Sequence, residues 1–198
     1  MGHNDVAPAL AAAFSTDVPI VALHLTRPAI EVPDREKMGI ASHIEASKGA
    51  YLIRDYDERP HDGVVIVRGT SSTNTVVSIL DEISSKYNVK IVSAISWELF
   101  DMQDSNYKSS IIGDCEWADS MIITNTGLNV MKNWISNRVV SDYSLSPDWD
   151  NRWRTGGSLE QIIDEAHLSP RWVIQAIDRF ATDRSKRLER LKQEIPEK

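Results

Sequence analysis

Short apolar runs separated by helix-like segments are the feature that most constrains how this chain can fold. Four runs rich in valine, isoleucine or leucine stand out: residues 18–25, 64–67, 89–95 and 120–124. Residues 18–25 are a near-continuous apolar run, which suits a strand buried on both faces, as in a parallel sheet. Because helical segments alternate with the four runs, the sequence predicts an α/β fold. We expect a three-layer sandwich, with a mostly parallel sheet of about five strands and helices on both faces.

The remaining elements follow from local signals. Ala50–Arg54 predicts a further short strand, and Val139–Tyr143 could be a last one. Asn4 or Asp5 can cap a helix over residues 4–14. Other helices are predicted near residues 34–45, after Gly69, near residues 128–136, and from two capping signals, Ser158 with Gln161 and Ser169 with Pro170. Beyond Asp183 the chain is mostly charged, so we expect residues 184–198 to form a helical tail that frays into solvent.

An aromatic and acidic corner follows the strand over residues 89–95. It begins at Ser96 and holds Trp97, Glu98, Phe100, Asp101, Gln103, Asp104 and Tyr107. This pattern resembles the C-terminal domain of transketolase, in which a strand ends in a similar corner. Weaker matches occur in the same order along residues 15–182: Leu25-Thr26-Arg27, residues 46–52, residues 66–71 and Leu168-Ser169-Pro170.

The resemblance implies a division of the chain. Residues 1–45 would be the last helix and strand of a pyrimidine-binding domain plus a linker, and residues 46–183 a transketolase C-terminal-like domain. One helix and one strand cannot close a core. The N-terminal piece is therefore expected to pack on the following domain or to complete a sheet of another chain. A split subunit, a truncated gene product and a fragment all fit this division.

The same resemblance implies that this chain binds no cofactor alone. In the family, thiamine diphosphate and Mg are held at a Gly-Asp-Gly motif and a glutamate that activates the cofactor. Gly113-Asp114-Cys115 lacks the second glycine. We expect no catalytic, cofactor-binding or metal-binding residue here, and a partner chain that carries the cofactor-binding domains. The complete enzyme would transfer a two-carbon ketol unit between sugar phosphates as a homo- or hetero-oligomer. This chain alone is not expected to catalyse that transfer.

Arg27 is the one functional residue that the resemblance implies. The corresponding arginine of the family contacts the phosphate of the sugar substrate, and a guanidinium suits this role because its planar donors bind two oxygens together. Here Pro28-Ala29 follows, where the family often has Gln-Asn. The alternative is a surface arginine paired with Glu31 or Asp34.

Two other functions stay open. The strand near residue 122 continues Ile-Thr-Asn-Thr-Gly, without the glutamate that is usual in the family. This departure favours a non-catalytic interaction or regulatory module with the same fold. The C-terminal part of a 2-oxoacid dehydrogenase E1 component has the same last domain, although the corner at Trp97 favours transketolase.

Charge and cysteine content narrow the partners and the compartment. The net charge of −7 argues against nucleic-acid binding, which needs a positive surface. The single cysteine, Cys115, cannot form a disulfide within the chain and fits a reducing compartment. No apolar run reaches the roughly 18 residues that span a bilayer, and no basic region opens the chain as in a signal peptide. We expect a soluble, cytoplasmic protein.

Several smaller motifs have a structural and a functional interpretation. The turn at Gly69-Thr70-Ser71-Ser72 could bind an anion, but it is neither a P-loop nor a dinucleotide fingerprint, so a tight turn with a hydroxyl cap is favoured. None of the five histidines has metal-ligand spacing, and His24 is expected to be a hydrogen-bonded core histidine. Trp149, Arg152, Trp153 and Arg154 could form a contact patch or a loop that covers the sheet.

Overall fold

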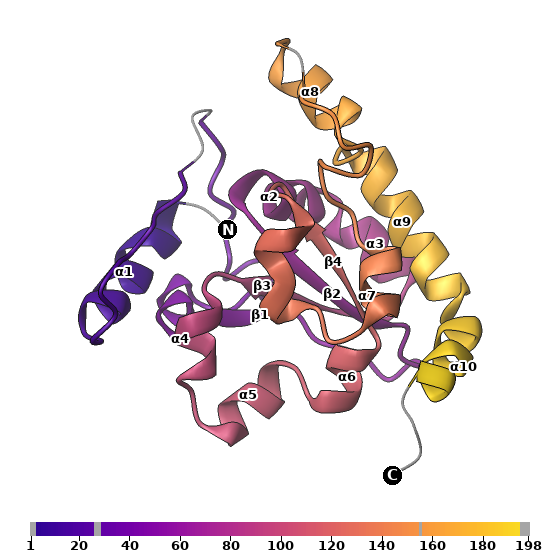
Figure 1. The fold of residues 1–198 in the computed structure, drawn as a ribbon, viewed down its shortest axis with the longest axis horizontal. Helices are drawn as coiled ribbons and strands as arrows, with labels where there is room; N and C mark the ends of the chain where they lie inside the picture. The colour runs from indigo at the N-terminus through magenta and orange to yellow at the C-terminus, as the bar shows by residue number, and fades with distance from the viewer. Residues whose placement is uncertain (1–2, 26–28, 155, 195–198) are drawn as a thin grey trace.

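The computed structural model describes residues 3–25, 29–154 and 156–194 (Figure 1). The sheet in this part of the chain has four strands: β1 (Ala50–Arg54), β2 (Gly63–Arg68), β3 (Val89–Ala94) and β4 (Ser120–Thr124). The α-helices are α1 (Val6–Phe14), α2 (Thr70–Ser78), α3 (Leu80–Lys86), α4 (Trp97–Asp101), α5 (Ser105–Ile111), α6 (Asp114–Ala118), α7 (Arg138–Tyr143), α8 (Leu159–Glu165), α9 (Pro170–Thr182) and α10 (Arg184–Glu194). Short 3-10 helices are η1 (His3–Asp5), η2 (His43–Lys48) and η3 (Leu128–Trp134).

The sheet has the strand order β1-β3-β2-β4. Strand β2 lies at its centre and pairs in parallel with both β3 and β4, whereas β1 pairs antiparallel with β3. The predicted α/β fold with a mostly parallel sheet is therefore confirmed, with four strands in place of about five.

Side chains of the central strands alternate between two hydrophobic clusters, as the period of two along a strand requires. Val65, Val67 and Ile91 face the cluster built with α2, α3 and α9. Val64 and Ile66 face the cluster built with α4, α5, α6 and η3. Figure 1 shows α4, α5 and α6 as a curved row along the lower edge, with α9 and α10 along the right side. The predicted helices on both faces are thus present.

The predicted strand over residues 18–25 is wrong for this chain. These residues belong to no helix or strand, and Ile20, Leu23 and Leu25 are exposed. A strand needs a neighbour for its backbone N–H and C=O groups, and no strand of the described chain pairs with this segment. His24 lies in the same segment and is exposed, so the prediction of a core histidine is also wrong.

The predicted last strand is a helix. Asn137 caps α7 by accepting a hydrogen bond from the Val140 backbone N–H at 3.1 Å. The position beside β4 is taken instead by Leu145, which forms an isolated parallel bridge with Ile123. The helical stretch predicted near residues 34–45 is a turn over residues 35–39 followed by η2.

The charged C-terminal segment does not fray over its described length. It forms α10, in which Arg187 and Leu191 are buried one turn apart. The capping box predicted at Ser158 is present, because Ser158 Oγ accepts from the Gln161 N–H and Gln161 Oε1 accepts from the Ser158 N–H. Pro170 begins α9 as predicted, and Val173, Ile177 and Phe180 are buried.

Candidate functional site

The carboxyl ends of the parallel strands meet at one edge of the sheet. After β2 the chain turns to α2 on one face, and after β3 it turns to α4 on the other face. Neighbouring strands whose connections leave in opposite directions open a crevice between them, which is the usual binding position in open α/β sheets. The end of β2 at Arg68 and the end of β3 at Ala94 border this crevice.

A cavity of about 390 Å³ occupies this edge. Its walls come from the ends of β2 and β3, from the N-terminus of α2, from Asn125 after β4, and from residues 22–25 with α1. The N-terminal segment therefore covers the edge of the sheet without joining it. We treat this cavity as the candidate functional site.

Glycine is required at the turn between β2 and α2. Gly69 has a φ of 90°, and a Cβ at this position would lie 1.8 Å from Asn125 Oδ1. Asn125 crosses the turn and donates from Nδ2 to Ser71 Oγ at 2.9 Å. The tight turn is present as predicted, but its hydroxyl cap is not, because Gly69 is itself the N-cap residue and no side chain caps α2. The Thr73 hydroxyl donates back to the Gly69 carbonyl.

Arg68 gives the cavity a positive charge that the sequence interpretation did not include. Burial lowers the pKa of its guanidinium, whereas the charge of Glu98 acts in the opposite direction. Its contacts are the Val130 carbonyl, 3.5 Å from Nη1, and the Met131 sulfur. No salt bridge to Arg68 occurs among the described residues. A charged residue at the end of an otherwise apolar strand was the sequence signal that could have identified Arg68.

Arg27 lies outside the described residues, so its predicted phosphate contact stays a prediction. The preceding residues His24 and Leu25 line the cavity.

A buried ion pair holds the N-terminal segment near this site. Asp5 is 4% exposed and accepts from Arg35 Nη2 at 2.5 Å and from the Tyr51 hydroxyl at 3.1 Å. Burial alone raises the pKa of Asp5, but nearby positive charge, including Arg35, outweighs burial and lowers it. Burial also raises the pKa of Tyr51, and the charge of Asp5 adds to this shift.

Within the described chain, no group of three His, Cys, Asp or Glu residues is arranged to hold a metal ion. Cys115 is exposed. No helix of the described chain is long and apolar enough to cross a membrane.

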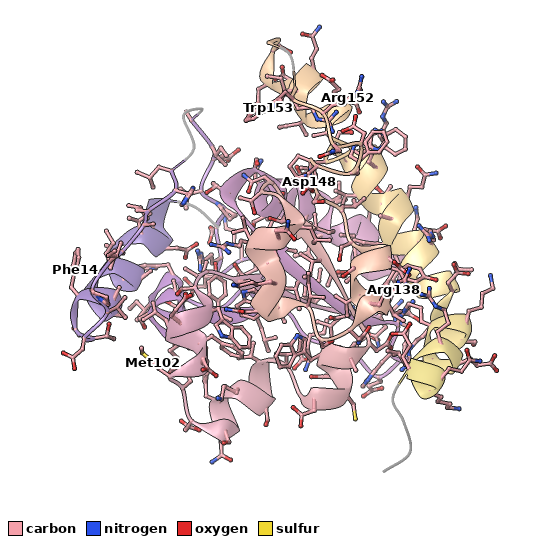
Figure 2. All side chains as sticks on the ribbon, viewed as in Figure 1. Phe14, Met102, Arg138, Asp148, Arg152 and Trp153 are labelled. Carbon is pink, nitrogen blue, oxygen red and sulfur yellow. The ribbon has the colours of Figure 1, made fainter. Side chains whose placement is uncertain are left out.

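The tryptophan-rich loop was predicted to be either a contact patch or a loop packed onto the domain, and its residues differ in this respect. Trp149 stacks on His167 with ring centroids 4.1 Å apart, and His167 stacks on Trp172 at 3.9 Å. Arg154 forms an ion pair with Asp150 at 2.8 Å. These contacts fasten the loop to the start of α9. Trp153, however, is 98% exposed, and Figure 2 places it with Arg152 at the projecting end of the molecule near α8.

The corner after β3 is built around aromatic packing. Ser96 caps α4, and Asp104 caps α5 by accepting from the Asn106 and Tyr107 N–H groups. The Tyr107 hydroxyl donates to the Ala50 carbonyl at 2.8 Å, which ties α5 to β1. Trp97 packs against Trp134 with ring centroids 5.1 Å apart. The corner therefore connects the end of the central sheet to the helices that cover its second face.

This geometry defines the class of the protein as a three-layer α/β domain with a cavity at the carboxyl edge of its sheet. Sequence similarity to curated proteins indicates which family this domain resembles. The chain is 33% identical over 94 residues to a chloroplastic transketolase of Craterostigma plantagineum, covering 45% of this chain and 18% of that protein. It is 30% identical over 97 residues to a chloroplastic transketolase of Zea mays, covering 47% of this chain and 14% of that protein. No protein-family model matches the chain.

Solved structures agree with the sequence similarity. A transketolase mutant from Pichia stipitis aligns with a TM-score of 0.64 and 18% identity, covering 90% of this chain and 24% of that one. Transketolase from Leishmania mexicana aligns with a TM-score of 0.55 and 14% identity, covering 72% and 19%. The predicted resemblance to transketolase is therefore confirmed in sequence and in fold. The chain spans less than a fifth of the length of the curated relatives named above.

Proposed function

We propose that this chain is the C-terminal portion or subunit of a transketolase-like, thiamine diphosphate-dependent enzyme. The observation that carries the proposal is the agreement of sequence similarity and fold with a limited part of transketolase. The complete enzyme would transfer a two-carbon ketol unit between sugar phosphates. Thiamine diphosphate supplies the carbanion stabilisation for such a transfer when it is bound.

In this proposal, the cofactor and Mg are held by a partner chain that carries the cofactor-binding domains. This chain contributes structural contacts in a homo- or hetero-oligomer, which we place in the cytoplasm. The exposed apolar side chains of residues 18–25 support such a contact, since Ile20 is 80% exposed and Leu25 58% exposed. An extended apolar segment without strand partners suits addition to the sheet of another chain.

The test is co-purification of this chain with a chain that carries the Gly-Asp-Gly motif, followed by a ketol-transfer assay with thiamine diphosphate and Mg. Activity of the mixture, with none from either chain alone, is the expected result. A stable chain that neither binds this partner nor restores activity would contradict the proposal.

Arg27 is proposed to bind the phosphate of the sugar substrate in the assembled enzyme. Arg27→Ala is then expected to raise the KM for a sugar phosphate by about tenfold or more, because hydrogen bonds to charged groups contribute roughly 1.5–3 kcal/mol. The exposed Arg138 provides the control, and Arg138→Ala should leave KM unchanged. An unchanged KM for Arg27→Ala would refute the role and leave the assembly proposal intact.

A non-catalytic interaction module is the second candidate. The nearly complete exposure of Trp153 favours it, because large aromatic side chains are enriched at binding hot spots. A module would bind its partner through Trp153 and would not restore ketol transfer. The third candidate, part of a 2-oxoacid dehydrogenase E1 component, predicts decarboxylation of a 2-oxoacid by the mixture in place of ketol transfer.

A further inference from the structure

A second cavity lies on the face of the sheet that α4, α5 and α6 cover. Its volume is about 330 Å³, within the range of small-molecule sites. It shares no lining residue with the cavity at the carboxyl edge. The three short helices surround it, and η3 contributes Trp134 to its wall. The proposed transketolase-like function makes no use of this cavity.

Four aromatic side chains form most of the apolar wall. Phe100 and Trp134 are buried and stack with ring centroids 5.3 Å apart. Trp97 and Trp117 are half-buried, with centroids 5.4 Å apart. The Trp117 indole N–H donates to the Trp134 carbonyl at 2.7 Å. This indole therefore has no donor left for an anion, and what it can offer a ligand is its ring.

The charged groups that line the cavity have a negative balance. Lys108 Nζ lies 3.4 Å from Asp101 Oδ1, so these two charges largely offset each other. Asp114 also lines the cavity, is exposed, and forms no ion pair with the described residues. The carboxylate of Asp114 therefore lines the same cavity as the indole rings and has no ion-pair partner among the described residues.

We propose that this cavity binds an organic cation with an apolar body, such as a substituted ammonium. A cation of this kind is attracted to indole rings and gains further from a carboxylate nearby. Its alkyl groups fill apolar volume that a hydrated metal ion could not. An anion is disfavoured, because Asp114 repels it and the Trp117 donor is already used.

The test compares two probes of nearly the same shape. Choline carries a trimethylammonium group, and 3,3-dimethyl-1-butanol carries a neutral tert-butyl group in its place. Isothermal titration and the indole N–H resonances of Trp97 and Trp117 report binding. We expect choline to bind about tenfold more tightly than the alcohol, since a partly desolvated cation–π contact is worth on the order of 1–2 kcal/mol.

Asp114→Asn supplies the matched variant. It should weaken choline binding about threefold and leave the binding of the alcohol unchanged, as expected for one exposed charge. Asp81→Asn, at an exposed position of α3 on the other face, should change neither. Equal affinities for the two probes, no choline binding, or equal effects of the two substitutions would overturn the proposal.

Discussion

At the scale of single residues, the ion pair between Arg187 and Asp119 fixes the last helix to the sheet. The Arg187 side chain is 1% exposed, and its Nη2 donates to Asp119 Oδ1 at 2.8 Å and to the Asp62 carbonyl at 3.0 Å. Its guanidinium also covers the Phe180 ring at 3.5 Å. Burial lowers the pKa of Arg187, but the charge of Asp119 opposes this shift.

Removing this arginine is expected to be costly. Arg187→Ala leaves the buried Asp119 carboxylate with Arg184 as its remaining ion-pair partner, and breaking a buried pair typically costs about 3–5 kcal/mol. We expect a loss near the lower limit of this range, measured by urea unfolding. Arg190→Ala on the same helix is the control. Its pair with Asp142 is about 40% exposed, so it should cost less than about 1 kcal/mol. Similar losses for both variants would contradict this account.

Gly49 offers a second prediction at this scale. Its φ is 85°, and an added Cβ would lie 2.2 Å from the Phe100 nitrogen and 2.4 Å from the Ser96 carbonyl oxygen. Both atoms belong to the backbone of the corner, which cannot move like a flexible side chain. Gly49→Ala is therefore expected to destabilise the fold by about 3 kcal/mol or more, because steric overlap adds to backbone strain.

Gly39→Ala is the matched control for Gly49→Ala. Gly39 also has a positive φ, of 64°, but a Cβ there would meet no atom within 4 Å. Backbone strain alone should cost about 1 kcal/mol. Thermal or urea unfolding of the two variants separates strain from overlap, and equal losses would show that overlap at the corner is unimportant.

At the scale of elements, α1 is held to the domain by a polar anchor. No residue of α1 itself is buried, whereas Asp5 directly before it is buried and paired with Arg35. The pKa of Asp5 is lowered from 3.8 in the folded chain. Its ionisation therefore stabilises the attachment fully above about pH 4, and this contribution is lost as pH falls through the lower folded value.

Acid should consequently release α1. We expect pepsin cleavage after the exposed Phe14 to accelerate in the native chain as pH falls below about 4. Asp5→Asn should release α1 already at neutral pH, where chymotrypsin can report the same cleavage. Asn4→Ala, at an exposed neighbouring position, should behave like the native chain. Slow cleavage of Asp5→Asn at neutral pH would refute the anchor.

The elements also show which parts of the fold the sequence can predict. Strands β2, β3 and β4 are rich in valine, isoleucine or methionine. Because they are buried on both faces, each strand carries this signal in its own sequence. The burial of helix α10 has no local sequence signal of this kind. Its buried Arg187 is stabilised by Asp119, which lies 68 positions earlier in the chain. Helix α7 has the β-branched pair Val139-Val140, but the cap at Asn137 and the bridge made by Leu145 decide its structure.

The candidate site was only partly predictable for a related reason. The glycine turn after β2 was visible, because a glycine between an apolar strand and a helix has a local signature. The cavity itself depends on Asn125 crossing that turn and on residues 22–25 covering the edge. Both are contacts between distant segments, which a local pattern does not record.

At the scale of the whole molecule, the apolar segment over residues 18–25 stands out because its side chains are exposed in the isolated chain. Ile20 is 80% exposed and Leu23 is 48% exposed. In Figure 1 this N-terminal part lies with α1 at the left of the sheet and of the helices that cover it. Because side chains this exposed contribute little to the stability of the monomer, substitutions here separate folding from assembly.

The double variant Ile20→Lys with Leu23→Lys tests this separation. Its free energy of unfolding should stay within about 0.5 kcal/mol of the native value, since both side chains are exposed. Its co-purification with the cofactor-binding partner chain should be lost, because two ammonium groups would be placed in an apolar contact. The control exchanges exposed apolar residues elsewhere, Ile44→Lys with Met102→Lys, which are 60% and 56% exposed. This control should retain the partner. If it loses the partner equally, or if the first variant keeps it, residues 18–25 do not form the contact.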